Sequence, residues 1–115
     1  MTKVLWFSRH TMTPEQKGAL EKKLGEIVIT QVDKTIQSAF ELKEDVEASD
    51  VICIVAPINI QSQFLKLAGN KPVLTAISNR RVIEDPQGGD SSVVFEFVRW
   101  DRIKKIEVVT ETFAE

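Results

Sequence analysis

Short apolar runs alternate with helix-like segments three times before residue 73, and this alternation constrains the fold more than any other feature. The four apolar runs lie at residues 4–7, 27–32, 51–56 and 73–77. The helix-like segments between them lie at residues 13–24, 35–48 and 60–68. Three strand–helix units in succession predict parallel strands joined by right-handed crossovers. We therefore expect an α/β fold, a Rossmann-like three-layer sandwich with four parallel strands.

The segment after the first apolar run carries a complete set of helix-start signals. Thr13 predicts the N-cap, Pro14 suits the first helical position, and Gln16 is the capping-box partner of Thr13. Gly25 predicts the end of the helix, because glycine readily adopts the left-handed conformation just beyond a helix C-terminus. These signals predict a helix that ends near Leu24.

Differences in polarity between the apolar runs predict the order of the strands. The first and third runs are the most apolar, as strands covered on both faces must be, whereas Thr30 and Gln31 make the second run suited to a sheet edge. This favours the order 2-1-3-4, and a Rossmann order with the second strand inside is the alternative. In the favoured order the chain reverses direction between the first and third strands. Ligands of such sheets bind outside the carboxyl ends of the strands at that reversal.

The pattern changes to antiparallel signals after the fourth run. Residues 84–92 form a polar stretch with a proline and two glycines, which is typical of a hairpin loop. Residues 93–100 and 106–113 both alternate between apolar and polar side chains, which predicts two more strands. Residues 101–105 fit either a turn or the start of a helix. We expect an antiparallel C-terminal hairpin beside the parallel strands, within a single domain over residues 1–115.

Composition narrows the class of protein. A net charge of −2 supplies no bulk attraction to duplex DNA or to an anionic membrane. The single cysteine, Cys53, lies inside an apolar run and predicts a buried core thiol without a disulfide. No secretion signal or membrane-spanning run is recognisable, so we expect a cytoplasmic protein.

Polar side chains gather after three of the strands, where the favoured order brings the carboxyl ends together. They are Ser8, Arg9, His10 and Thr11 after the first strand, Asn59 and Gln61 after the third, and Ser78, Arg80 and Arg81 after the fourth. This rim contains no carboxylate unless Asp33, after the second strand, leans in. The starts of the helices at Thr13 and near Asn59 add backbone N–H groups. Such a rim suits phosphate or carboxylate groups, with arginine as a bidentate partner.

Each of these residues also has a structural interpretation. His10 fits a polar turn position, and Asn59 and Gln61 fit the cap of the third helix. Arg80 and Arg81 fit a hairpin strand, and if that strand continues, only one of the two arginines faces the rim.

The sequence lacks the motifs of several common nucleotide-binding, hydrolase and metal sites. The chain has no GxGxxG after its first strand, no phosphate-binding P-loop and no GxSxG elbow. One histidine and one cysteine do not make a zinc site of the usual kinds. We expect no metal and no cofactor.

The N-terminal quarter, "VLWFSRHTMTPEQKGALEKKLG", resembles a group of very small CRISPR-associated Rossmann-like proteins, some of which are ring nucleases that degrade cyclic oligoadenylates. The family pattern is an apolar strand, Phe-Ser-His, a short gap, Thr-x-x-Gln and a glycine that ends the helix. Its matches here, in order, are Phe7, Ser8, His10, Thr13, Gln16 and Gly25. The departure is Arg9, which is inserted between Ser8 and His10 and moves the histidine by one position.

The resemblance implies a metal-independent phosphodiesterase in which a ribose 2′-hydroxyl attacks the adjacent phosphorus. It implies catalytic roles for Arg9 and His10, electrostatic support from Arg80 or Arg81, and ligand contacts from Ser8, Thr11 and Asn59. A symmetric cyclic ligand further implies a homodimer, with Trp100 and Phe113 as candidates for its interface.

Two alternative functions remain open. The same rim suits a sensor that binds a nucleotide or another small anion without cleaving it. The chain is also consistent with a protein-interaction module of a mobile element or phage, in which the sheet edge is the working surface.

Overall fold

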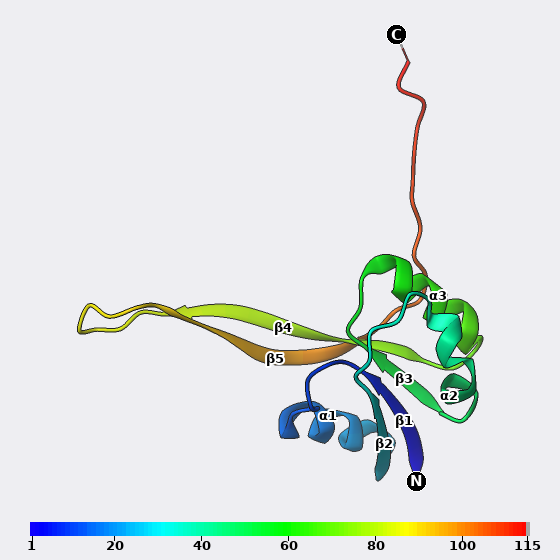
Figure 1. Cartoon of the computed structure of the whole chain (residues 1–115), viewed down its shortest axis with the longest axis horizontal. Coiled ribbons are helices and arrows are strands. Elements are labelled where there is room, and N and C mark those ends of the chain that lie inside the picture. Colours follow the sequence, from blue (N-terminus) through cyan, green and yellow to red (C-terminus); the bar gives the residue numbers. More distant parts are fainter. Residues whose placement is uncertain (115) are drawn as a thin grey trace.

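The computed structural model describes residues 1–114 of the chain. Its strands are β1 (Thr2–Phe7), β2 (Ile27–Val32), β3 (Val51–Ile54), β4 (Val73–Ile83) and β5 (Ser92–Arg102). Its helices are α1 (Pro14–Leu24), the 3-10 helix η1 (Ala39–Leu42), α2 (Lys43–Glu47) and α3 (Ile58–Ala68). Figure 1 shows a helix-covered body from which the β4–β5 hairpin and the C-terminal segment, residues 104–114, project in different directions.

The strands form one mixed sheet in the order β2-β1-β3-β4-β5. Strands β1 to β4 pair in parallel, and β5 runs antiparallel to β4. The predicted order 2-1-3-4 is therefore confirmed, and the alternative with the second strand inside is wrong. The chain belongs to the α/β class.

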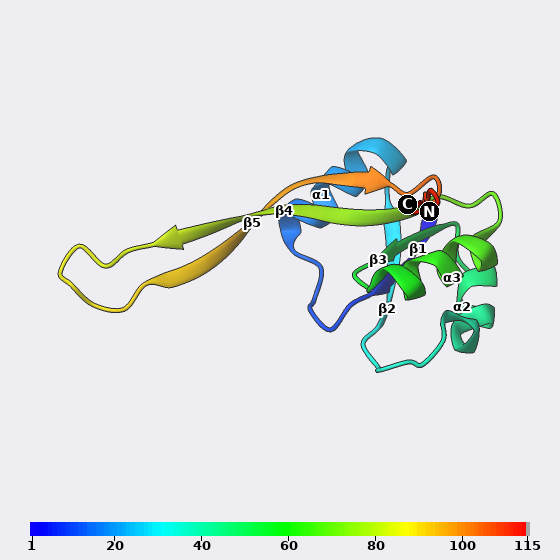
Figure 2. The ribbon, with the colours of Figure 1, turned by 90° about the horizontal axis from the view of Figure 1, so that it is seen from above.

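Helices lie against both faces of the sheet within the body (Figure 2). Alternate residues of β1 point to opposite faces, so Val4 and Trp6 join the cluster under α1 while Leu5 joins the cluster under α3. Strand β3 lies between these two clusters, and all four of its residues are buried. This burial on both faces explains why its sequence is apolar throughout.

The helix α1 begins and ends where the sequence predicts. The Thr13 side chain accepts a hydrogen bond from the backbone N–H of Gln16, and the Gln16 side chain accepts one from the N–H of Thr13. Gly25 follows the helix with φ at 78°, a conformation that favours glycine. The capping box and the terminal glycine thus fix both ends of this helix.

The helix predicted over residues 35–48 is wrong in its first part. The helical region begins only at Ala39, because Ser38 caps it: its hydroxyl accepts from the N–H of Phe40, and its own N–H donates to Glu41. Ser38 and Glu41 form a second capping box, which the spacing Ser-x-x-Glu signals in the sequence. Residues 33–38 are consequently a loop that lies beyond the end of β2.

The region after residue 77 differs from the prediction in two ways. The fourth strand does not end there but continues to Ile83, and beside Ile77 and Ser78 the partner strand β5 has a bulge at Val98. The strand predicted over residues 106–113 is wrong, since that stretch forms no strand, and residues 103–105 are neither helix nor turn. Alternation favours a strand only where a neighbouring strand is available to pair with it.

Aromatic contacts fasten the base of the hairpin to the body. The rings of Trp6 and Trp100 meet edge to face, with centroids 5.7 Å apart, and Trp100 Nε1 donates to the backbone oxygen of Gln16 at 2.9 Å. Trp100 therefore packs within its own chain. None of the helices within residues 1–114 is long and apolar enough to cross a membrane.

Candidate functional site

The loop that follows β1 is held in place by a set of hydrogen bonds to its backbone. Trp6 Nε1 donates to the oxygen of His10 at 2.8 Å, and Gln31 Nε2 donates to the oxygens of both Ser8 and His10. The hydroxyl of the buried Ser8 accepts from the N–H of His10 at 3.1 Å. Because its hydroxyl and carbonyl oxygen are engaged in this way, Ser8 acts in this structure as a brace that orients Arg9 and His10.

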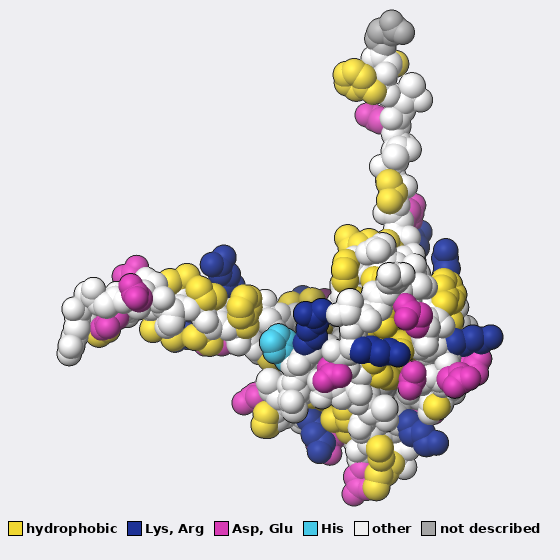
Figure 3. Space-filling model, viewed as in Figure 1, with side chains coloured by type: hydrophobic (Ala, Val, Ile, Leu, Met, Phe, Trp, Pro, Cys, Tyr) yellow, Lys and Arg dark blue, Asp and Glu magenta, His cyan; other side chains and the backbone are white. Residues whose placement is uncertain are grey.

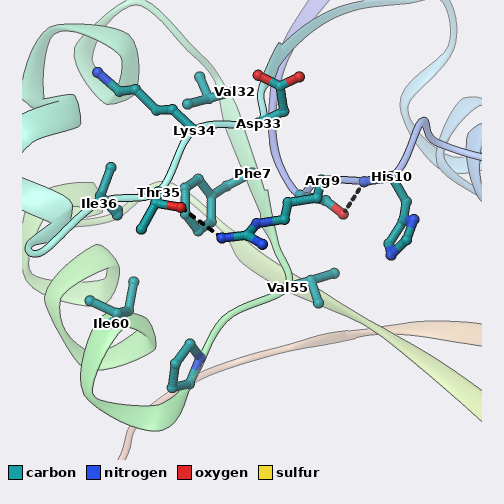
Figure 4. Close-up of a pocket in the computed structure, with 12 residues that line it drawn as sticks. Phe7, Arg9, His10, Val32, Asp33, Lys34, Thr35, Ile36, Val55 and Ile60 are labelled. Carbon is teal, nitrogen blue, oxygen red and sulfur yellow. Dashed lines mark hydrogen bonds between the residues drawn. The ribbon is translucent and has the colours of Figure 1, made fainter.

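The side chain of Arg9 lies in a hollow of about 370 Å³ at the carboxyl ends of β1, β2 and β3. Its Nη2 donates to the hydroxyl of Thr35 at 2.6 Å, so the guanidinium reaches from the loop after β1 to the loop after β2 (Figure 4). We call this cavity the Arg9 hollow. Its lining residues are Phe7, Ser8, Arg9, His10, Val32, Asp33, Lys34, Thr35, Ile36, Val55, Pro57 and Ile60.

The Arg9 hollow combines apolar walls with the guanidinium group of Arg9. Phe7, Val55 and Ile60 contribute apolar surface. Apart from the bond to Thr35, the Arg9 guanidinium donates no hydrogen bond to another group of residues 1–114, so its other N–H groups can bind a ligand. Pro57 is the N-cap of α3, and no side chain of residues 1–114 caps this helix. The first N–H groups of α3 therefore also remain free to bind an anion.

The side chains of Asp33, Lys34 and His10, which also line the Arg9 hollow, point away from the Arg9 guanidinium (Figure 4). Figure 4 shows Asp33 and Lys34 directed outward, away from the Arg9 guanidinium. The imidazole of His10 points to the opposite side of Val55 from Arg9 (Figure 4). Arg9 and His10 are thus neighbours in sequence whose side chains diverge.

A second hollow, of about 870 Å³, lies between the loop after β1 and the base of the hairpin. We call it the hairpin hollow. Its lining residues are Trp6, Ser8, His10, Thr11, Thr13, Glu15, Gln16, Val55, Ala76, Ser78, Phe95, Glu96 and Phe97. Glu15 and Glu96 place two carboxylates here, so the expectation of a carboxylate-poor rim is wrong for this half. Figure 3 shows the histidine at the junction of body and hairpin.

The predicted rim residues are therefore divided between two cavities. His10 and Ser8 line both, Arg9 lines only the Arg9 hollow, and Thr11 and Ser78 line only the hairpin hollow.

The remaining candidates line neither cavity. Arg81 forms an ion pair with Glu96 at 3.0 Å on the hairpin, and Arg80 lies on the hairpin one residue before it. Gln61 donates to the oxygen of Ala56 at 2.8 Å and steadies the loop before α3. The expected meeting of three loops is therefore wrong for the two hairpin arginines, because β4 continues and carries them away from the body.

Sequence reasoning missed the contribution of residues 34–36, which line the Arg9 hollow. The signal was available, since β2 lies beside β1 in the predicted order and its carboxyl end must face the same edge. The prediction of a helix over residues 35–48 hid the fact that residues 34–36 form a loop at this edge.

Comparisons with family models, with curated proteins and with solved structures find no match to this chain.

Proposed function

We propose that the protein binds an anionic, nucleotide-type ligand in the Arg9 hollow, at the carboxyl ends of the parallel strands. The observation that carries the proposal is the Arg9 guanidinium, held by Thr35 in a cavity with apolar walls beside the start of α3, whose N-cap Pro57 makes no side-chain hydrogen bond. The proposal also interprets the sheet, which has helices on both faces, as a Rossmann-like three-layer sandwich. In such folds, ligands bind at the carboxyl ends of the parallel strands.

The two parts of a nucleotide match the two parts of the cavity. A phosphate group would bind the guanidinium of Arg9 through charge-assisted hydrogen bonds and receive further N–H groups from α3. A base would lie against the apolar wall formed by Phe7, Val55 and Ile60. The volume falls within the range of roughly 300–1,000 Å³ that is typical of small-molecule sites.

Cleavage of a cyclic oligoadenylate is the more specific form of this proposal, and it draws on the N-terminal resemblance. A ribose 2′-hydroxyl would attack the adjacent phosphorus, the 5′-oxygen would leave, and a 2′,3′-cyclic phosphate would remain. His10 would accept the 2′-hydroxyl proton or return one to the 5′-oxygen. Since His10 and Arg9 lie on opposite sides of Val55, the scissile phosphate would have to sit at the boundary between the two hollows.

Titration calorimetry with cyclic tetra-adenylate and with AMP, both in EDTA, tests binding. We expect Arg9→Ala to weaken the affinity by about ten- to a hundredfold, as expected for lost hydrogen bonds to a charged group. Arg99→Ala is the matched control, because neither Arg99 nor its ion-pair partner Asp101 lines either hollow. No binding of either probe, or equal losses in the two variants, would contradict the proposal.

Product analysis of the same mixtures separates the enzyme from the sensor. Linear products ending in a 2′,3′-cyclic phosphate, formed by the unmodified chain and lost in His10→Ala, would support the nuclease. Binding without products would support the non-catalytic sensor.

A further inference from the structure

The outer edge of β5 and the C-terminal segment are two β-forming surfaces that have no strand partner within residues 1–114. Strand β5 is the last in the sheet order, so one row of its backbone N–H and C=O groups is unpaired. Residues 106–113 retain the alternating pattern of a strand, yet they pair with nothing. Both surfaces also expose apolar side chains: Phe95 is 69% exposed, Val108 86% and Val109 83%.

We propose that residues 106–113 of one copy pair with the free edge of β5 in a second copy, and that the exchange is reciprocal. Each chain offers one edge and one segment, so two copies related by a two-fold axis satisfy both. At roughly 3.3 Å per residue, an extended segment of this length spans about 26 Å, which is most of β5. Addition of a strand to an exposed sheet edge is a common mode of protein recognition.

Pairing of the segment with β5 of its own chain is disfavoured by the sequence of the connection. A tight reversal after Arg102 would need a residue with positive φ, and Ile103-Lys104-Lys105 contains no glycine, asparagine or aspartate. The N–H of Ile103 donates to the oxygen of Val73, and its side chain packs on the cluster under α3. The chain therefore leaves the body past α3, away from the hairpin (Figure 1).

The charges of the two surfaces are complementary, which favours a second copy as the partner. The strands β4 and β5 carry four arginines against two carboxylates. Residues 106–114 carry two glutamates, Glu107 and Glu111, and no cation. Arg80 and Arg102 form no ion pair with any other part of residues 1–114, and they are available to Glu111. Glu107 already pairs with Lys105 of its own segment.

The distribution of apolar surface agrees with this placement. Figure 3 shows hydrophobic side chains along much of the visible hairpin and at intervals along the C-terminal segment. Val93 and Phe95 share one face of β5 with the partners Val82 and Arg80 on β4. A segment paired with the edge of β5 would cover part of the face that carries Val93 and Phe95. The valines of the segment would become buried at the same time.

The oligomeric state of the full chain, measured by sedimentation equilibrium over micromolar to submillimolar concentrations, tests the proposal. We expect a dimer, and we expect a chain that ends at Lys105 to remain a monomer over this range because it has no segment to exchange. Thr110→Pro should have a similar effect because proline removes a backbone donor from the pairing, while Thr110→Ser should have none. The segment carries no helix or strand, so these changes leave the body folded, as circular dichroism would verify.

A mixing experiment tests whether the pairing partners are those proposed. Val93→Glu/Phe95→Glu places two carboxylates beside the acidic segment and should block the edge. Neither this variant nor the shortened chain should self-associate, but a mixture of the two should form a heterodimer, since one supplies a segment and the other an edge. A monomeric full chain, a dimer that the shortened chain retains, or a mixture that does not associate would each overturn the proposal.

Discussion

The body and the β4–β5 hairpin use the same kinds of β-forming residue but bury them to opposite extents. Strand β3, Val-Ile-Cys-Ile, is buried at every position because α1 covers one face and α3 the other. In the hairpin, Val82 is 54% exposed, since no helix reaches it. Burial is therefore set by what covers a strand, and an apolar sequence alone does not determine it.

The change from buried to exposed residues occurs within a single strand, β4. Strand β4 begins at the buried Val73, passes through half-buried residues, and is exposed from Ser78 to its end. A bulge in the pairing lies at this transition: Ile77 and Ser78 are opposite Arg99 and Phe97, which leaves Val98 of β5 as the extra residue. Because bulges bend a strand and increase its twist, this one marks where the hairpin departs from the body.

The strongest test of this comparison replaces one phenylalanine in each region. Phe64 of α3 is fully buried and contacts Phe7 of β1, with ring centroids 5.4 Å apart. We expect Phe64→Ala to lower the free energy of unfolding by about 3–5 kcal/mol, because it loses apolar burial and leaves a cavity. Phe95→Ala, the matched control on the hairpin, should change it by less than about 0.5 kcal/mol. Urea unfolding measures both, and similar losses would show that the hairpin contributes to the core.

This contrast also explains which parts of the fold could be predicted from sequence. The parallel strands, their order and the ends of α1 follow from local signals, namely apolar runs, a capping box and a terminal glycine. The length of β4 does not, because Arg80 and Arg81 fit either the rim or a continued hairpin strand in the sequence, and only their pairing with β5 decides between the two.

The candidate site was predictable to the same extent. The location of Arg9 and His10 at the end of β1 follows from the strand order alone. The divergence of their side chains depends on the hydrogen bonds of Trp6 and Gln31 to the loop, which are tertiary contacts. The separation of Arg80 and Arg81 from the site depends on the extension of β4.

The buried thiol of Cys53 makes the stability of the body depend on pH. Burial raises the pKa of this thiol from its ordinary 9.0 to about 12, because the thiolate is poorly solvated in the core. Between these values the unfolded chain releases the proton and the folded chain keeps it, so stability falls as the pH rises from 9 to 12. The expected slope is at most about 1.4 kcal/mol per pH unit.

Comparison with Cys53→Ala isolates this slope from the titration of the lysines. Urea unfolding at several pH values should show a steeper loss for the unmodified chain than for the variant. Parallel pH profiles would mean that the thiol is solvated, and that β3 is less well covered than the body–hairpin comparison requires.

A smaller effect is expected where the body meets solvent, at the start of α1. Thr13→Ala removes the hydroxyl that accepts from the N–H of Gln16 and should cost about 1 kcal/mol of unfolding free energy. Thr13→Ser retains the acceptor and should stay close to the unmodified chain. Equal losses in the two variants would place the stabilisation in the threonine methyl group instead of the cap.

The smallest expected effect comes from the largest change, which is removal of the distal hairpin. Joining Asn79 to Glu96 through Asn-Gly keeps their pairing and replaces residues 80–95 by a type I′ turn. The Trp6–Trp100 contact at the hairpin base remains, so its fluorescence reports unfolding in urea. Because the removed residues are exposed and cover no part of the core, the free energy of unfolding should change by less than about 0.5 kcal/mol. A loss above about 2 kcal/mol would show that the distal hairpin supports the body, and the two regions would then have to be treated as one cooperative unit.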